Sequence, residues 1–158
     1  MTVYFPTVRT GKMKQKVLLR LAARRKSMAE IHPKSTVFVL EDDPGVRDSL
    51  TALLEAVGIR TRTFVCGTDI VRSAPILVDG CLLLDICLPD FDGFEVLRRL
   101  RDANVQLPAI FMTGQEFQAQ SAQAPRLGAV AVLRKPISDT LLLSAISTAL
   151  VSAKAQTA

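Results

Sequence analysis

The stretch CLLLDICLPDFDG, residues 81–93, joins an apolar run to a charge at its end. Four apolar side chains precede Asp85, and Pro89 and Gly93 punctuate the segment that follows. A short apolar run without polar alternation is typical of a strand buried on both faces of a sheet. A buried strand that finishes on a carboxylate indicates that the charge serves a site at that end of the strand.

Strand and helix patterns alternate on both sides of this stretch. The strands we expect are 36–40, 60–65, 81–85, 108–112 and 129–133, and the helices are 44–58, 68–74, 93–103, 115–128 and 138–153. Asp43 and Ser138 are suitable N-caps for two of these helices, and Pro44 suits a first helical position. Parallel strands need crossover helices, so the alternation predicts an α/β fold, a doubly wound five-stranded parallel sheet with five helices.

The helix expected at 115–128 has the weakest pattern of the five. Its apolar anchors are few, namely Phe117, Ala124 and Leu127, and Pro125 lies in its last turns. Proline in a helix interior costs about 3 kcal/mol or more and removes a backbone donor. We therefore expect this helix to kink or to end early.

The charge divides the chain of 158 residues into unequal parts. Residues 1–34 hold nine Lys or Arg side chains against one acid, whereas residues 35–158 hold eleven basic and fourteen acidic groups. We interpret 1–34 as a basic extension, flexible or partly helical, 35–153 as one domain and 154–158 as a tail. The basic extension could bind DNA or an anionic membrane surface, whereas the body is mildly acidic.

Composition argues against several other classes of protein. Cys66, Cys81 and Cys87 are odd in number and lack metal-ligand spacing, which favours a reducing, cytoplasmic setting over a disulfide framework. Charged residues interrupt every apolar run before the roughly 18 residues that a membrane span requires. One Tyr and no Trp disfavour an aromatic platform for single-stranded nucleic acids.

Polar side chains gather where the predicted strands end, which is the edge at which open α/β sheets bind ligands. They are Glu41, Asp42 and Asp43 after the first strand, Asp85 after the third, Thr113 after the fourth, and Lys135 before Pro136 after the fifth. Crowded carboxylates repel one another unless a cation lies among them, and hard oxygen ligands beside a phosphate suit Mg²⁺. A carboxylate nucleophile, a metal, a hydroxyl and an ammonium are the groups that phosphoryl transfer to an aspartate needs.

Four segments together resemble the receiver domain of two-component response regulators. They are VFVLEDDPGVRDSL, LLLDICLPDFDGFEVL, PAIFMTG and GAVAVLRKP, and the resemblance runs from about Thr36 to Ala153. It implies the flavodoxin-like strand order 2-1-3-4-5, which the chemotaxis receiver shares with flavodoxin. The remaining roles below follow from this resemblance.

The resemblance implies a metal site on the acidic residues. Asp85 matches the phosphoacceptor, Asp42 the direct Mg²⁺ ligand, and Glu41 a ligand that acts through water. The backbone carbonyl of Cys87 would supply the third direct ligand from the protein.

The resemblance also implies how the phosphoryl group is held and used. Thr113 and Lys135 would bind the phosphoryl oxygens, and Lys135 and Pro136 match a bond that is often cis in the family. We expect a histidine kinase to donate the phosphoryl group, so that the chain is a phosphoacceptor assisting its own phosphorylation rather than an ordinary enzyme. Because the sequence stops soon after the last predicted helix, we expect a stand-alone regulator.

The expected output is phosphorylation-dependent protein binding. The surface would comprise residues 115–128, 129–133 and 138–153, and its partner would be an effector protein or a second copy of the chain. Val132, however, occupies a position where the family commonly has an aromatic residue that turns inward on activation. A receiver-fold binding module uncoupled from phosphorylation is therefore an alternative.

Two further alternatives concern the start of the chain and a different enzyme class. Residues 28–40, MAEIHPKSTVFVL, would be a natural start for a receiver, which would make 1–27 a wrongly assigned start or a disordered arm rather than a DNA-binding arm. Haloacid-dehalogenase phosphatases also use an aspartate at a strand end, but they need a second aspartate two residues later. Cys87 occupies that position and cannot shuttle the proton.

Overall fold

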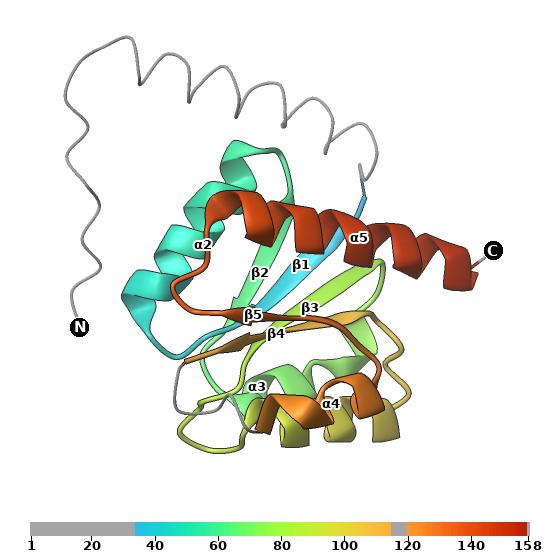
Figure 1. Cartoon of the computed structure of the whole chain (residues 1–158). Coiled ribbons are helices and arrows are strands. Elements are labelled where there is room, and N and C mark those ends of the chain that lie inside the picture. The colour runs from blue at the N-terminus through green and yellow to red at the C-terminus, as the bar shows by residue number, and fades with distance from the viewer. Residues whose placement is uncertain (1–33, 115–119, 158) are drawn as a thin grey trace, which may run out of the picture.

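The computed structural model describes residues 34–114 and 120–157. Five parallel strands form one sheet in the order β2-β1-β3-β4-β5 (Figure 1). The strands are β1 (Thr36–Leu40), β2 (Arg60–Phe64), β3 (Gly80–Asp85), β4 (Ala109–Thr113) and β5 (Ala129–Arg134). The predicted fold class and strand order are confirmed.

Helices cover both faces of this sheet (Figure 1). One face carries α2 (Pro44–Ala56) and α5 (Asp139–Thr157), and the other carries α3 (Gly67–Arg72) and α4 (Gly93–Asp102). This arrangement follows from the parallel pairing, because each crossover between parallel strands must pass over a face. Both faces of the central strand β3 are therefore buried, which explains its unbroken apolar run.

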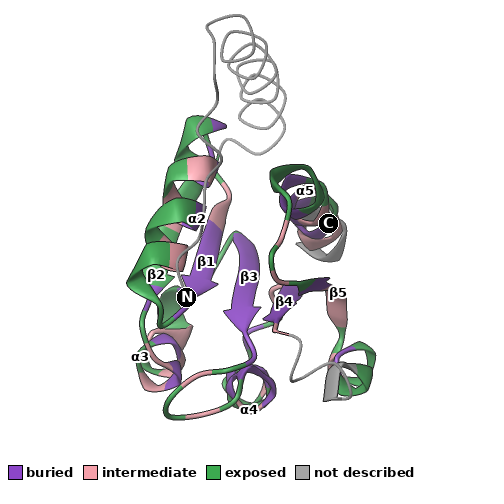
Figure 2. Ribbon diagram, turned by 60° about the vertical axis from the view of Figure 1, so that its left-hand side comes forward, coloured by how far each residue is buried: buried purple, intermediate pink, exposed green. Residues whose placement is uncertain are grey.

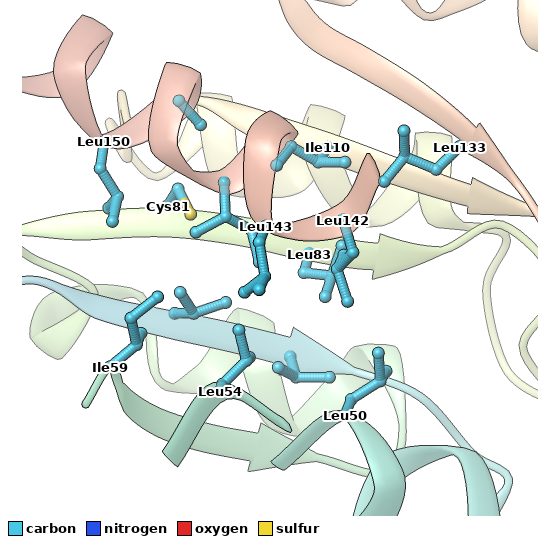
Figure 3. Close-up of a cluster of buried hydrophobic side chains, with 14 of the residues drawn as sticks. Leu50, Leu54, Ile59, Cys81, Leu83, Ile110, Leu133, Leu142, Leu143 and Leu150 are labelled. Atoms are coloured by element: carbon cyan, nitrogen blue, oxygen red, sulfur yellow. The ribbon is translucent and has the colours of Figure 1, made fainter. Parts of the chain in front are cut away.

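An aliphatic cluster fills the space between the sheet and the α2/α5 face. Figure 3 shows Leu83 of β3 among Leu50 and Leu54 of α2 and Leu142 and Leu143 of α5. The opposite cluster, under α3 and α4, contains the rings of Phe94 and Phe111, which are tilted by 55° to each other with their centroids 4.7 Å apart. The scarcity of aromatic residues thus gives a core that is mostly aliphatic.

The predicted helix caps are present. The Asp43 carboxylate accepts a hydrogen bond of 2.9 Å from the Val46 amide, and Pro44 follows it at the first helical position. The Ser138 hydroxyl accepts a bond of 3.3 Å from the Leu141 amide. Helix α5 then continues to Thr157, beyond its predicted end at residue 153.

The segment predicted as a helix at 115–128 differs from the expectation. Its described part forms two short 3₁₀ turns, Gln120–Gln123 and Pro125–Leu127, and residues 115–119 lie outside the described residues. Pro125 starts the second turn, where its missing N–H is tolerated, and Gly128 ends it in a left-handed conformation with a φ of 73°. The described ranges therefore contain four α-helices instead of the five predicted.

The basic extension of residues 1–34 lies almost wholly outside the described residues. Its predicted helix, its DNA binding and the alternative start at Met28 stay predictions. Within residues 34–114 and 120–157, no helix has the length and apolar character that crossing a membrane requires.

Candidate functional site

The register of the sheet brings four strand ends together. Leu40 of β1 pairs with Leu84 of β3, so that Glu41 and Asp85 follow at neighbouring positions. Asp85 pairs with Met112 of β4, and the Lys135 amide donates a 2.8 Å bond to the Thr113 carbonyl. All of the residues predicted for the site therefore lie at or just beyond the carboxyl edge of the sheet.

Glu41, Asp42 and Asp85 form an acidic cluster at this edge. One carboxylate oxygen from each lies within 4.8 Å of the others. Glu41 and Asp85 are buried, with 1% and 4% of their surface exposed, whereas Asp42 is exposed. Two of the carboxyl groups are thus buried in the protein, and the third faces solvent.

Lys135 supplies the positive charge beside the cluster. Its Nζ lies 2.7 Å from Oδ2 of Asp85 and 2.8 Å from Oε2 of Glu41, so that one ammonium bridges the two buried carboxylates. The peptide bond between Lys135 and Pro136 is cis, as the resemblance implies. The charges come from three different strands, which explains why no short sequence motif contains the whole site.

The electrostatics of the cluster follow from this packing. Burial raises the pKa of Glu41 to about 7, and the Asp85 carboxylate adds to the rise, while the hydrogen bond from Lys135 opposes it. Burial alone would lower the pKa of Lys135, but its bonds to Asp85 and Glu41 outweigh that effect and raise it. The ammonium is therefore firmly charged, and one cation is too few for three carboxylates.

The donor set fits a divalent cation. Its carboxylate oxygens are hard ligands of the kind that Mg²⁺ prefers, and they converge within 4.8 Å. With all groups ionised, the three carboxylates and the Lys135 ammonium leave two negative charges, which a divalent cation would balance.

Arg47 fixes the loop that carries two of the acidic residues. Its guanidinium donates to the backbone carbonyls of Glu41 and Asp42, at 2.9 and 3.1 Å. The Asp43 amide donates to Oε1 of Glu41 at 3.2 Å, while the Asp43 side chain caps α2. The first two acids are thus turned toward the site, and Asp43 serves the helix.

The loop after β3 holds Asp85 from the other side. The Cys87 amide donates a 3.0 Å bond to Oδ1 of Asp85, and the Cys87 side chain is exposed. A Cβ added to Gly93 would collide with the Asp85 carbonyl, so only glycine lets the start of α4 approach so closely. The predicted use of the Cys87 carbonyl as a metal ligand stays a prediction.

Thr113 lies buried at the end of β4. Its hydroxyl donates a 2.9 Å bond to the Gly114 carbonyl. The residue is adjacent to Met112, the partner of Asp85 in the sheet, and so the hydroxyl is at the edge of the site. Its role toward a phosphoryl oxygen stays a prediction.

Asp90 has a role that the sequence reasoning missed. Its carboxylate accepts bonds from the Gly67 amide at 3.0 Å, the Thr68 amide at 2.8 Å and the Thr68 hydroxyl at 2.9 Å. These bonds join the loop after Asp85 to the start of α3. A Pro-Asp pair in the loop was the only available signal, and it could not identify a partner 22 residues away.

The chain is similar to known receivers over most of this fold. Residues 37–147 match the family model described as the response regulator receiver domain. Nodulation protein W of Bradyrhizobium diazoefficiens is 37% identical over 117 residues, which cover 74% of this chain and 52% of that protein. Response regulator protein TmoT of Ectopseudomonas mendocina is 32% identical over 117 residues, which cover 74% and 53%. The chain thus spans about half the length of these curated relatives.

Solved structures show the same similarity in three dimensions. The crystal structure of FixJ-N has a TM-score of 0.71 and 31% identity, and the match covers 75% of this chain and 94% of that one. The response regulator StyR has a TM-score of 0.73 and 32% identity, with 78% and 62% covered.

Proposed function

This chain belongs to the family of response regulator receiver domains, and we propose that Asp85 accepts a phosphoryl group from the phosphohistidine of a histidine kinase. The observation that carries the proposal is the surroundings of this carboxylate. Asp85 ends a fully buried strand, and its two oxygens contact the Lys135 ammonium and the Cys87 amide. A carboxylate held in one orientation beside a cation is suited to attack phosphorus.

The transfer itself is a substitution at phosphorus. An oxygen of Asp85 forms the new bond to phosphorus as the bond from phosphorus to the imidazole nitrogen breaks. The electron pair of that bond stays on the imidazole, and the charge on the phosphoryl group is conserved. The residues around Asp85 therefore act by orienting it and by neutralising charge in the transition state.

Lys135 and Thr113 would bind the phosphoryl oxygens. The Lys135 ammonium, now on Asp85 and Glu41, would exchange one of these contacts for a phosphoryl oxygen. The Thr113 hydroxyl would likewise leave the Gly114 carbonyl. Each exchange replaces an existing hydrogen bond, so that phosphorylation can change the conformation of the loops that follow β4 and β5.

Asp42, Asp85 and the Cys87 carbonyl would hold Mg²⁺, with Glu41 acting through water. When bound, the metal neutralises charge on the phosphoryl oxygens. The convergence of the three carboxylates supports this assignment. Arg47 would keep Glu41 and Asp42 in place through their carbonyls.

Intact mass after incubation with acetyl phosphate tests the proposal. The wild type should gain the mass of one phosphoryl group with Mg²⁺ present and none after chelation. Asp85→Asn should gain none, whereas Asp48→Asn, a matched change of an exposed acid on α2, should behave as the wild type. Unmodified wild-type protein that nevertheless binds Mg²⁺ would contradict the proposal.

The second candidate function is a receiver-fold module that binds its partner without a phosphorylation switch. Val132, on the edge strand β5, is half-buried and packs against the cluster that contains Phe111, its neighbour in the sheet. A β-branched side chain has one preferred rotamer and little bulk to swing. Phosphorylation that leaves both partner binding and oligomeric state unchanged would favour this function.

A further inference from the structure

Strand β2 forms an edge of the sheet with backbone groups directed outward. Within the described ranges no strand pairs with its outer side. The backbone carbonyl of Phe64 accepts a 3.1 Å bond from the Glu41 amide, so the backbone polar groups of Phe64 point toward β1. Because backbone groups alternate along a strand, the amides and carbonyls of Thr61 and Thr63 point away from β1. An edge of this kind can pair with another extended chain.

A groove of about 460 Å³ runs across β1 and β2 at the end of the sheet opposite Asp85, and Arg60 and Arg62 of the edge strand form part of its lining. Cationic Lys34, Arg60 and Arg62 line it together with a single acid, Asp79. Ile76 and Val78 also line it, and 46% and 59% of their surfaces are exposed. These are two of the five large apolar side chains that are exposed in the described part of the chain. The groove therefore combines positive charge with an accessible apolar wall.

The charge of this groove discriminates among the segments that could occupy it. The chain's own residues 1–33, with eight basic side chains and one acid, would bring like charge to the groove. A second copy that paired β2 with β2 about a twofold axis would place arginines opposite arginines, and like charges directly opposite in a sheet are destabilising. An acidic segment meets neither obstacle.

We infer that the β2 edge binds an extended acidic segment of a partner protein, which adds to the sheet as a further strand. Arg60 and Arg62 lie on one face about 7 Å apart along the strand, so carboxylates at alternate positions of the partner would match them. An apolar side chain of the partner would pack on Ile76 and Val78. The inference goes beyond the proposed function and does not depend on it, because the groove lies at the other end of the sheet.

Selection of a random dodecapeptide library on the full chain tests this inference. The enriched peptides should carry Asp or Glu at alternate positions, and a synthetic copy of one should be measured by fluorescence anisotropy. Arg62→Glu should weaken its binding by roughly tenfold or more, while Arg62→Lys should retain most of the affinity. Arg126→Glu makes the same charge change on the exposed 3₁₀ turn that contacts β5, at the opposite edge, and should leave affinity unchanged.

Hydrogen exchange on the peptide complex separates strand addition from loose charge attraction. Strand addition should slow exchange at the outward amides of Thr61 and Thr63. The inference is overturned by a selection without acidic peptides, by equal weakening in Arg62→Glu and Arg126→Glu, or by unchanged exchange at both threonines. Duplex DNA that binds and loses affinity in Arg62→Glu, with no peptide bound, would also overturn it and assign the edge to nucleic acid.

Discussion

Strands β3 and β5 both deliver a charged residue to the site, but their surroundings differ. All six residues of β3 are buried, whereas only Leu133 is buried among the six of β5 (Figure 2). Strand β3 lies between β1 and β4 under helices on both faces, while β5 is an edge strand preceded by 3₁₀ turns. Asp85, the proposed nucleophile, therefore ends a fully buried strand, whereas its cationic partner Lys135 follows a less covered one.

The largest test of this difference is a pair of core truncations. Leu84→Ala in β3 should lower the free energy of unfolding by about 3 kcal/mol, because the fully buried side chain leaves a cavity. Val132→Ala in β5 should cost about 1 kcal/mol or less, because that side chain is partly exposed and smaller. Urea denaturation measures both. Similar losses in the two variants would show that β5 is as tightly packed as β3.

Lys135 contacts Asp85 at the end of β3 and also Glu41 just after β1, and the pH dependence of stability tests the burial of this second carboxyl group. The pKa of Glu41 rises from 4.5 to about 7 on folding, so the folded state binds more protons than the unfolded state between these values. Stability from this group is thus fully present below about pH 4.5 and is lost as the pH rises through 7. The loss should be about 3 kcal/mol at most, in metal-free buffer.

Glu41→Gln provides the reference for this experiment. The amide of the new side chain does not titrate. The free energy of unfolding of Glu41→Gln should therefore fall less than that of the wild type between pH 5 and pH 8. Urea denaturation at each pH gives the difference. Equal pH dependence in the two proteins would mean that folding does not raise the pKa of Glu41.

Gly93 and Gly114 compare the loops that follow β3 and β4. Gly93→Ala should lower the free energy of unfolding by about 2 kcal/mol, because the new methyl group meets the Asp85 carbonyl and the backbone must shift. At Gly114 an added Cβ has nothing within 4 Å, so Gly114→Ala should cost less than about 0.5 kcal/mol. Thermal or urea unfolding of both variants measures the difference. A mild effect at Gly93 would show that the loop after β3 can relax as freely as the one after β4.

The contrast between β3 and β5 also explains what could be predicted from the sequence. The buried strands have apolar runs, and so the strands and the placement of Glu41, Asp42, Asp85 and Lys135 at their ends could be inferred from the sequence pattern. The strand order was implied by the resemblance to receiver domains. The helix at 115–128 was predicted from a weak pattern, and Pro125 instead starts a 3₁₀ turn in its described part. A local sequence pattern predicts the secondary structure of such segments poorly, because they have few apolar contacts that would favour one conformation over another.

Contacts between distant loops were outside the reach of sequence reasoning. The bonds of Asp90 to Gly67 and Thr68 depend on how two loops lie after folding. The bridge from Lys135 to Glu41 and Asp85 likewise required the register of three strands. The residue types were available in the sequence, whereas their pairing was a property of the fold.

Substitution of Asp90 should have only a small effect on stability. This residue lies in the loop after β3 and contacts the start of α3, on the side of β3 away from β5. Desolvation alone would raise the pKa of Asp90, but the hydrogen bonds from Gly67 and Thr68 outweigh that effect and lower the pKa to about 2. Asp90→Ala should lower the free energy of unfolding by about 1 kcal/mol at pH 7, a modest effect because the carboxylate is exposed to solvent. Asp48→Ala, on the outer surface of α2, should cost less.

The pH dependence of this loss has the opposite sign to that of Glu41. An acid whose pKa is lower in the folded state stabilises above its unfolded pKa, here 3.8, and that stability disappears as the pH falls toward 2. The difference in the free energy of unfolding between wild type and Asp90→Ala should therefore narrow in acid. The difference between wild type and Glu41→Gln should instead change between about pH 4.5 and 7. Urea denaturation of the three proteins from pH 2 to pH 8 tests both. A gap for Asp90→Ala that stayed constant in acid would mean that its loss comes from packing in the loop and not from the charged carboxylate.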